Sequence, residues 1–204
     1  MVELKRPEIE LLLEKKDVKL RSLIASYGAL IVAYSGGVDS TFLAGVAHEV
    51  LGDKALAVTS RSPSVAPEEL EAASVLAEER GWRHLIVDTD EMNDPRYLAN
   101  DGRRCFFCKT ELYTHLDKVA GDESIGLVAN GANTDDLGDY RPGMEAAKNF
   151  EVVSPLVDAG MNKQEIRALS LKMDLPTWDK PAQPCLSSRI PYGTMVSVDA
   201  LGKI

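Results

Sequence analysis

The sequence predicts an α/β fold in which helices cover both faces of a parallel five-stranded sheet. Two observations support this prediction: short apolar runs alternate with longer segments of helical periodicity, and polar or glycine-rich turns follow the apolar runs. Strands that alternate with helices are typical of a parallel sheet, because each strand needs a helical crossover to reach the next. The expected strands are residues 30–33, 55–59, 84–87, 125–129 and 151–153.

The first expected elements are an amphipathic helix over residues 8–20, a strand over 30–33 and a second helix from Thr41. Glu, Lys and Leu alternate in the first segment, as in a helix with one apolar face. The strand is continuously apolar, which is typical of a strand buried on both faces. A glycine turn at 34–40 joins this strand to the second helix.

The second apolar run, 55–59, is followed by a helix over residues 67–80. Pro67 in its first turn, two glutamates directly behind it and Gly81 at its end are ordinary start and stop signals. The third strand, 84–87, comes next.

Helices over residues 103–119 and 162–173 complete the regular pattern. Four prolines then exclude regular structure and predict a long loop: Pro176, Pro181, Pro184 and Pro191. Ligands of parallel sheets gather beyond the carboxyl ends of the strands. We therefore expect the functional site among the loops 35–40, 60–64 and 130–143.

The composition of the chain favours some classes of function over others. The 204 residues suffice for one large domain, alone or with an appendage, and 45% apolar with 27% charged residues is ordinary for a globular protein. With 23 basic and 32 acidic residues, the formal charge of −9 disfavours nucleic acid as a binding partner and favours a small-molecule substrate.

We expect neither an export signal nor a membrane partner, because no apolar run reaches spanning length. Three cysteines, an odd number, then indicate reduced thiols in the cytoplasm.

The glycine turn, Tyr-Ser-Gly-Gly-Val-Asp-Ser at residues 34–40, predicts an anion-binding site. Gly36 and Gly37 let a ligand approach the backbone, and Ser35, Ser40 and the first amides of the following helix supply donors at its positive end. No lysine follows the glycines, so the turn is not a Walker loop. It resembles the S-G-G-x-D-S signature of the PP-loop ATP pyrophosphatases, which split ATP between the α and β phosphates.

The C-x-x-C formed by Cys105 and Cys108 falls early in a predicted helix, so both thiols lie on one face. Arg103, Arg104 and the helix N-terminus are expected to lower the pKa of both thiols. The third cysteine, Cys185, lies far downstream in the proline-rich loop.

Several kinds of site are open to these three cysteines. A [4Fe-4S] cluster that keeps one iron open is the preferred interpretation, because there is no fourth cysteine. A structural zinc ion usually needs a fourth ligand, which would be a histidine. The C-x-x-C pair could instead be a redox dithiol or two inert structural thiols. The candidate histidines are His48, His84 and His115.

Three motifs carry a family resemblance: Ser-Gly-Gly-Val-Asp-Ser at 35–40, Asp-Tyr-Arg-Pro-Gly at 139–143 and Cys-Leu-Ser-Ser-Arg-Ile-Pro-Tyr-Gly at 185–193. Together they resemble the LarE family, ATP-dependent sulfur transferases that make the nickel-pincer nucleotide cofactor of lactate racemase. The resemblance extends from about Val18 to the end of the chain. It implies an adenine nucleotide alpha-hydrolase-like fold and a homo-oligomer, a hexamer.

The resemblance also implies a two-stage reaction. A carboxylate of pyridinium-3,5-biscarboxylic acid mononucleotide attacks the α-phosphate of ATP and releases pyrophosphate. Sulfur from sulfide or another sulfur donor then displaces AMP and leaves a thiocarboxylate.

Residue roles for the nucleotide follow from the resemblance. Asp39 would be catalytic by engaging Mg²⁺, a hard cation that prefers oxygen ligands. The remaining ATP contacts would come from Ser35, Gly36, Gly37 and Ser40 at the phosphates and from Ser60, Arg61 and Gly131 near the adenosine.

The resemblance assigns the anionic substrate to Arg141, Ser188 and Arg189, since a guanidinium suits a carboxylate or phosphate. An acidic loop precedes Arg141 and would either hold a metal ion, orient Arg141 or form a solvated turn. Its residues are Asp135, Asp136 and Asp139.

Cys185 corresponds to a cysteine that one branch of the family sacrifices, giving up its sulfur and becoming dehydroalanine. A second branch holds a [4Fe-4S] cluster through three cysteines and passes on an extra sulfide. Because Cys105 and Cys108 are present as well, we predict that all three cysteines are cluster ligands and keep the sacrificial role of Cys185 as the alternative.

We expect residues 1–178 to form the PP-loop domain and residues 179–204 to form a substrate and cysteine loop. The family usually continues into a small C-terminal segment, so the chain ending at Ile204 is expected to be truncated. Three alternatives remain: a tRNA thiolase, an ammonia-using ATP pyrophosphatase, and a non-catalytic module that binds a nucleotide or metal.

Overall fold

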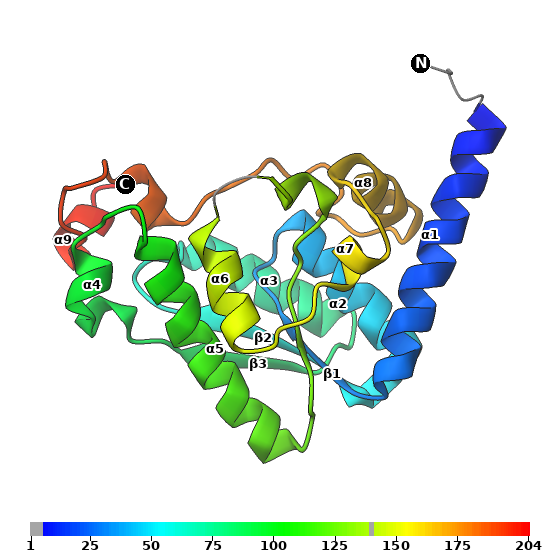
Figure 1. Cartoon of the computed structure of the whole chain (residues 1–204), viewed down its shortest axis with the longest axis horizontal. Helices are drawn as coiled ribbons and strands as arrows, with labels where there is room; N and C mark the ends of the chain where they lie inside the picture. Colours follow the sequence, from blue (N-terminus) through cyan, green and yellow to red (C-terminus); the bar gives the residue numbers. More distant parts are fainter. Residues whose placement is uncertain (1–5, 139–140) are drawn as a thin grey trace.

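The computed structural model describes residues 6–138 and 141–204. Its centre is a parallel four-stranded sheet with the strand order β3-β2-β1-β4 (Figure 1). The strands are β1 (Leu30–Ala33), β2 (Ala55–Arg61), β3 (His84–Asp88) and β4 (Val128–Ala129). All three strand pairs are parallel, with Leu30 opposite Ala55 in the central pair. The prediction of a parallel α/β sheet is confirmed.

The prediction of a fifth strand is wrong. Residues 151–153 contribute a single parallel bridge, between Ala129 and Val153, next to β4. Pairing does not extend further because Glu151 has a φ of 53°, outside the strand region, and Pro155 begins a helix directly afterwards. The sheet therefore has four strands and one bridging residue at its edge.

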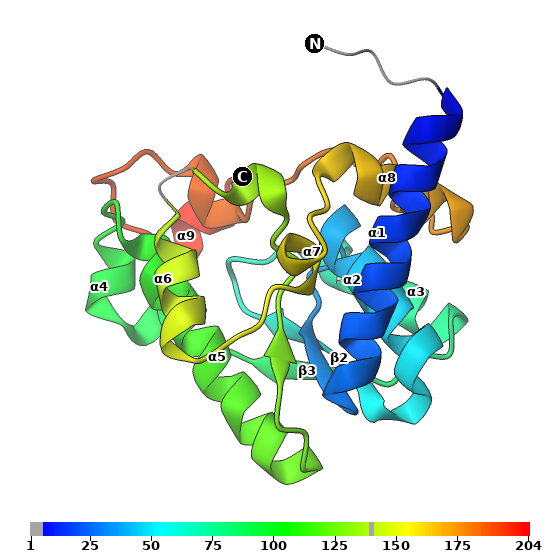
Figure 2. The same ribbon diagram turned by 45° about the vertical axis from the view of Figure 1, so that its right-hand side comes forward.

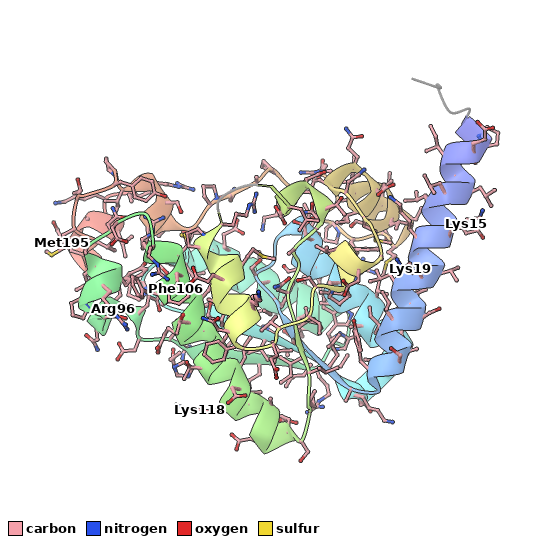
Figure 3. All side chains as sticks on the ribbon, in the orientation of Figure 1. Lys15, Lys19, Arg96, Phe106, Lys118 and Met195 are labelled. Carbon is pink, nitrogen blue, oxygen red and sulfur yellow. The ribbon has the colours of Figure 1, made fainter. Side chains whose placement is uncertain are left out.

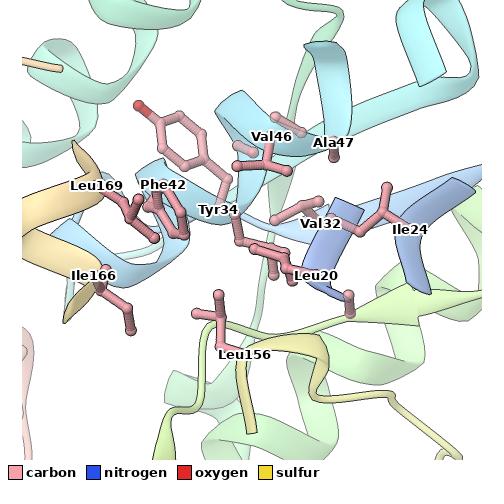
Figure 4. Close-up of a cluster of buried hydrophobic side chains, with 14 of the residues drawn as sticks. Leu20, Ile24, Val32, Tyr34, Phe42, Val46, Ala47, Leu156, Ile166 and Leu169 are labelled. Carbon is pink, nitrogen blue, oxygen red and sulfur yellow. The ribbon is translucent and has the colours of Figure 1, made fainter. Parts of the chain in front are cut away.

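Four long helices cover one face of the sheet (Figures 1 and 2). They are α1 (Arg6–Tyr27), α2 (Val38–Leu51), α3 (Pro67–Glu79) and α8 (Lys163–Lys172). Their apolar side chains meet Leu30 and Val32 of β1 in the larger core, where Leu20 and Phe42 are completely buried (Figure 4). A helix was predicted at each of these positions, from an amphipathic pattern at α1 and from start and stop signals at α3.

The opposite face is covered by α5 (Arg104–Glu123) and α6 (Pro142–Asn149). Ile31 of β1 points to this side and packs against Leu116 of α5 and Ala147 of α6 in the second core. The alternation of Leu30, Ile31 and Val32 between the two cores is the period-two pattern of a strand buried on both faces.

The shorter helical segments were not predicted. Besides α6, they are α4 (Pro95–Leu98), α7 (Pro155–Asp158), α9 (Val198–Leu201) and the 3₁₀ turns η1 (Gly52–Lys54), η2 (Glu91–Asn93), η3 (Thr134–Asp136) and η4 (Leu186–Arg189). A single turn of helix is too short to show helical periodicity.

After α8, the chain crosses the carboxyl ends of the strands and reaches α9 beside α4 (Figures 1 and 2). We call this stretch, residues 173–197, the crossing segment. A third apolar cluster fixes this crossing segment, because Ile190, Val196 and Leu201 pack against Tyr97 of α4. Among the residues that the structure describes, no helix combines the length and apolarity needed to span a membrane.

The order of the strands in the sheet indicates where the functional site lies. β2 and β3 lie on one side of β1, and β4 lies on the other, so the strand order reverses at β1. Beyond the carboxyl ends of such strands a crevice opens, and ligands of open parallel sheets bind there.

Candidate active site

A cavity of about 670 Å³ opens beyond β1. The turn after β1 forms one wall, with Ser35, Gly37 and Asp39, and the crossing segment forms another, with most of residues 180–189. The start of α3, Arg141 and the start of α8 complete the lining. The glycine turn and Cys185, which are far apart in the sequence, therefore face the same cavity.

The turn after β1 is shaped by its own serines. Ser35 N donates to Ser40 Oγ (3.1 Å), the two hydroxyl oxygens lie 3.0 Å apart, and Ser40 Oγ also donates to Gly37 O (3.2 Å). The chain is thereby bent back over the first turn of α2, whose opening amides border the cavity. A helix N-terminus in this position is suited to bind phosphate.

Two glycines allow backbones to approach one another closely at this turn. Gly36 has a φ of 72°, and a Cβ there would lie 2.9 Å from the Cβ of Ala73 in α3. A Cβ on Gly131 would lie 2.9 Å from Ser40 N. Gly131, which was predicted near the adenosine, therefore lies against the first turn of α2.

Asp39 faces the cavity and is already paired. Its Oδ2 lies 2.5 Å from Lys163 Nζ, at the start of α8, and Asn133 Nδ2 donates to its Oδ1 (3.4 Å). Carboxylate oxygen is the donor that Mg²⁺ prefers, so the residue fits the predicted metal role. The lysine is the group that a metal ion would have to replace.

Lys180 is a second cation at the turn. Its Nζ donates to Gly36 O (3.1 Å) and pairs with Glu69 Oε2 of α3 (2.5 Å). Among the described residues, the charged groups lining the cavity are four cations, Arg141, Lys163, Lys180 and Arg189, and two carboxylates, Asp39 and Glu69. This local excess of positive charge, in a chain of net charge −9, suits a polyphosphate and an anionic substrate.

Ser60 and Arg61, two of the three residues predicted near the adenosine, lie in different surroundings. Ser60 lines a smaller cavity of about 70 Å³, which shares Ser35 and Glu69 with the larger one. Arg61 instead forms a bidentate pair with Asp88 of β3, at 2.6 and 2.8 Å. Ser60 thus borders the nucleotide side of the site, whereas Arg61 joins two strand ends.

The predicted substrate arginines both line the larger cavity. Arg141 Nη1 lies 2.6 Å from Asp136 Oδ1, so Asp136 orients it, as one of the predictions for the acidic loop had it. Asp135 instead accepts a hydrogen bond from the first backbone N–H of α8 (2.9 Å). Arg189 reaches the cavity from the crossing segment, and Asp139 lies outside the described residues.

Cys105 and Cys108 lie in the first turns of α5, and Cys185 lies at the rim of the cavity, directly before η4. The first two thiols are half-buried and the third is exposed. Cys185 Sγ lies 3.2 Å from Ser188 Oγ, which accepts a hydrogen bond from Arg104 Nη2 (3.1 Å). The structure thus places Ser188, predicted at the substrate, against the thiol of Cys185.

The predicted lowering of the thiol pKa is wrong for Cys108. Burial raises the pKa of the Cys108 thiol to about 12, and the neighbouring Glu91 carboxylate adds to the rise. Lys109 lowers this pKa, but desolvation of the thiolate outweighs the attraction of the cation.

The three thiols lie within electrostatic reach of one another, since Cys185 and Cys105 also raise the pKa of Cys108. The side chain of Lys109 as a whole is exposed, yet protein surrounds its ammonium group and desolvation lowers its pKa. Tyr113 and the three thiols raise the pKa of Lys109, and together they outweigh the effect of desolvation. The net shift of this pKa is therefore upward. Lys109 is thus a cation beside all three cysteines.

The three thiols form no single-ion site among the described residues. Within residues 6–138 and 141–204, no three His, Cys, Asp or Glu side chains surround one point as zinc ligands do. Ligands of a [4Fe-4S] cluster bind separate irons and need not converge in this way. The three histidines have other partners: His48 bonds Ala44 O, His84 bonds Thr59 Oγ1 and His115 pairs with Glu111.

Several residues of the site were missed from the sequence. Lys163 carried a weak signal, since it opens a helix whose N-cap is Asn162. Lys180 and Glu69 carried none, because a lysine between prolines and a glutamate in a first helical turn are ordinary surface residues. Arg104 was noticed only as a charge near the thiols, and its burial could not be read from its position.

Comparison with known proteins shows which proteins the chain is similar to. Residues 12–97 match the NAD synthase family. The chain is 48% identical over 193 residues to an uncharacterised protein of Synechocystis sp., covering 95% of this chain and 72% of the relative. It is 32% identical over 193 residues to the pyridinium-3,5-bisthiocarboxylic acid mononucleotide synthase of Lactiplantibacillus plantarum, covering 94% and 70%. A tRNA-specific 2-thiouridylase of Rickettsia felis is 27% identical over 74% of this chain and 52% of its own.

Proposed function

The chain belongs to the LarE family, together with the pyridinium-3,5-bisthiocarboxylic acid mononucleotide synthase of L. plantarum, and we propose that it uses ATP to insert sulfur into pyridinium-3,5-biscarboxylic acid mononucleotide. One observation carries the proposal beyond the family: the glycine turn, the two substrate arginines and Cys185 line one cavity. A site that activates a carboxylate and then delivers sulfur needs these groups within reach of a single bound substrate.

In the first stage, a substrate carboxylate attacks the α-phosphorus of ATP, and pyrophosphate leaves. The amides that open α2, with Ser35 and Gly37, bind the phosphates. Lys163 and Lys180 neutralise the charge of the departing pyrophosphate. Asp39 would hold Mg²⁺, which neutralises phosphate charge when it is bound.

In this proposal, two arginines bind the substrate that accepts the sulfur. Arg141, oriented by Asp136, and Arg189 of the crossing segment present guanidinium groups to the same cavity. A substrate with two carboxylates and a phosphate offers each of them a bidentate partner. Holding the second carboxylate leaves the first free to react.

In the second stage, sulfur forms a bond to the carbonyl carbon of the acyl adenylate, and the C–O bond to AMP breaks. Cys185 lies at the rim of this cavity and brings sulfur to it. A [4Fe-4S] cluster, held by Cys105, Cys108 and Cys185, would supply an iron that carries the sulfur to be transferred. The alternative is that Cys185 gives up its own sulfur.

The experiment incubates the protein with ATP, Mg²⁺, sulfide and pyridinium-3,5-biscarboxylic acid mononucleotide, and measures pyrophosphate together with the mass of the product. Asp39→Asn should slow pyrophosphate release about 100-fold or more, because the carboxylate that would hold Mg²⁺ at the phosphates is lost. Asp53→Asn is the matched control, since Asp53 lies in η1 before β2, at the opposite end of the sheet.

The products of this experiment distinguish the proposed function from its alternatives. A pyrophosphate yield unchanged in Asp39→Asn would remove Asp39 from the mechanism. An amide product formed with ammonia would indicate an ammonia-using enzyme, and ATP binding without pyrophosphate would indicate a non-catalytic module. A tRNA complex that weakens steeply with salt would favour a tRNA thiolase.

A further inference from the structure

We propose that Arg104 is the positioning residue that assembles the three cysteines into one sulfur-delivering centre. The inference rests on the proposed function and adds a residue to it. Arg104 is the first residue of α5, directly before Cys105, and its side chain is 3% exposed. Buried arginines are rare unless their donors are all engaged.

The guanidinium of Arg104 binds the crossing segment directly. Its Nη1 donates to Ser187 O (2.6 Å) and to Asn100 Oδ1 (2.6 Å), and its Nη2 donates to Ser188 Oγ (3.1 Å). Two of these three acceptors belong to η4, the turn that follows Cys185. A side chain of α5 thus fixes the segment that carries the third thiol.

The same guanidinium lies between the thiols. Arg104 Nη2 is 4.0 Å from Cys105 Sγ, and the Ser188 hydroxyl that it binds is 3.2 Å from Cys185 Sγ. Arg104 therefore connects one cysteine of α5 with the cysteine of the crossing segment, directly on one side and through a hydroxyl on the other.

The charge of Arg104 has no carboxylate partner among the described residues. Neighbouring arginines do have one: Arg103 pairs with Glu145 and Arg96 pairs with Asp94. A buried cation without a counter-ion is costly unless polar groups bind it, and the oxygens of Asn100, Ser187 and Ser188 do so here. The burial of Arg104 thus depends on its bonds to Asn100 and to η4.

Other bonds support the crossing segment at the same place. Tyr97 Oη and Ser187 Oγ lie 2.5 Å apart, and Asn100 Nδ2 donates to Pro191 O (2.9 Å) and Thr194 O (2.8 Å). These contacts hold the segment as a whole near α4. Arg104 is the member of the network that also touches a thiol.

The test compares Arg104→Gln, Arg104→Lys and the adjacent, half-exposed control Arg103→Gln. Metal-free, reduced protein is treated with dibromobimane, which fluoresces after it joins two thiols, and the joined peptides are identified by mass spectrometry. The link between Cys105 and Cys108 lies within one helix and serves as the internal standard. Pyrophosphate release and sulfur insertion from sulfide are measured on anaerobically reconstituted protein.

In Arg104→Gln, links that contain Cys185 should fall about tenfold or more relative to the internal standard, as expected when charged hydrogen bonds are lost. Sulfur insertion should fall much further than pyrophosphate release. Arg104→Lys, which keeps the charge, should recover part of both losses, and Arg103→Gln should resemble the native protein.

Two outcomes would overturn the proposal. Links to Cys185 that are undiminished in Arg104→Gln would show that another contact positions the thiol. A parallel fall of pyrophosphate release and sulfur insertion would make Arg104 a general structural residue. Failure of the native protein to release pyrophosphate is a different result, because it rejects the proposed function while the cross-links still report on the thiols.

Discussion

Gly131 shows how a single residue can set the geometry of the nucleotide site. Its Cα faces the backbone of α2 so closely that an added Cβ would lie 2.9 Å from Ser40 N and 3.1 Å from Ser40 Cα. Both contacts are to backbone atoms, which cannot rotate away as a flexible side chain can. The turn that binds phosphate therefore depends on the absence of a side chain in the loop after β4.

We expect Gly131→Ala to weaken ATP binding about tenfold or more and to lower the free energy of unfolding by roughly 1–3 kcal/mol, because α2 must move. Calorimetric titration with ATP and denaturant unfolding measure both quantities. Gly126→Ala is the control, since nothing lies within 4 Å of a Cβ at Gly126. Native ATP affinity in Gly131→Ala would show that the two backbones need not meet so closely.

At the scale of elements, the way in which α8 begins places Lys163 at the cavity. Asn162 Oδ1 accepts from Glu165 N (2.9 Å) and Glu165 Oε2 accepts from Asn162 N (2.9 Å), a capping box that starts the helix at Lys163. Lys16 of α1 pairs with the same glutamate (2.7 Å). The cap thereby fixes the Cα from which Lys163 reaches Asp39.

Asn162→Ala should lower the free energy of unfolding by about 1 kcal/mol, the usual cost of a lost N-cap, and should also weaken ATP binding several-fold. Ser197→Ala is matched to it, because Ser197 caps α9 by accepting from Ala200 N (3.1 Å) and does not line the cavity. The control should lose comparable stability and keep its ATP affinity. Equal losses of affinity in both variants would contradict the role of the cap.

For the whole molecule, the decisive feature is the crossing segment, which brings Cys185 from the end of the chain to the first turn of α5 (Figures 1 and 2). Figure 3 shows how far this segment extends: Met195 lies at the left-hand end of the molecule, the end at which Arg96 of α4 also lies. Because ligands from two distant parts of the chain would share one cluster, cluster binding should stabilise the fold as a whole.

Anaerobic reconstitution should therefore load iron and sulfide in a ratio near one to one and raise the melting temperature, and Cys185 should keep its sulfur after turnover. Iron and sulfide analysis, thermal unfolding and mass spectrometry of the Cys185 peptide measure these outcomes. Cys185→Ser should lose iron, whereas Ser188→Ala should still bind it. Protein free of iron, with dehydroalanine at position 185 after turnover, would instead establish the sacrificial route.

Much of this architecture could be predicted from local pattern. The long helices and β1 to β3 were predictable because short apolar runs alternate along the chain with segments of helical pattern. The short fifth strand failed, since an apolar run of three residues does not reveal that Glu151 has a positive φ. The predicted hexamer and the division after residue 178 stay predictions.

The sequence by itself determined the family, the parallel α/β sheet and the anion-binding turn, because these depend on residues adjacent in the chain. Only the tertiary structure decided which charges meet at the site: Lys163 with Asp39, Lys180 with Glu69, and Arg104 with the loop of Cys185. It also decided that burial raises the pKa of Cys108 despite the cations nearby in sequence. The physical reason is that desolvation and Coulomb energies depend on distances in space, which the order of residues does not specify.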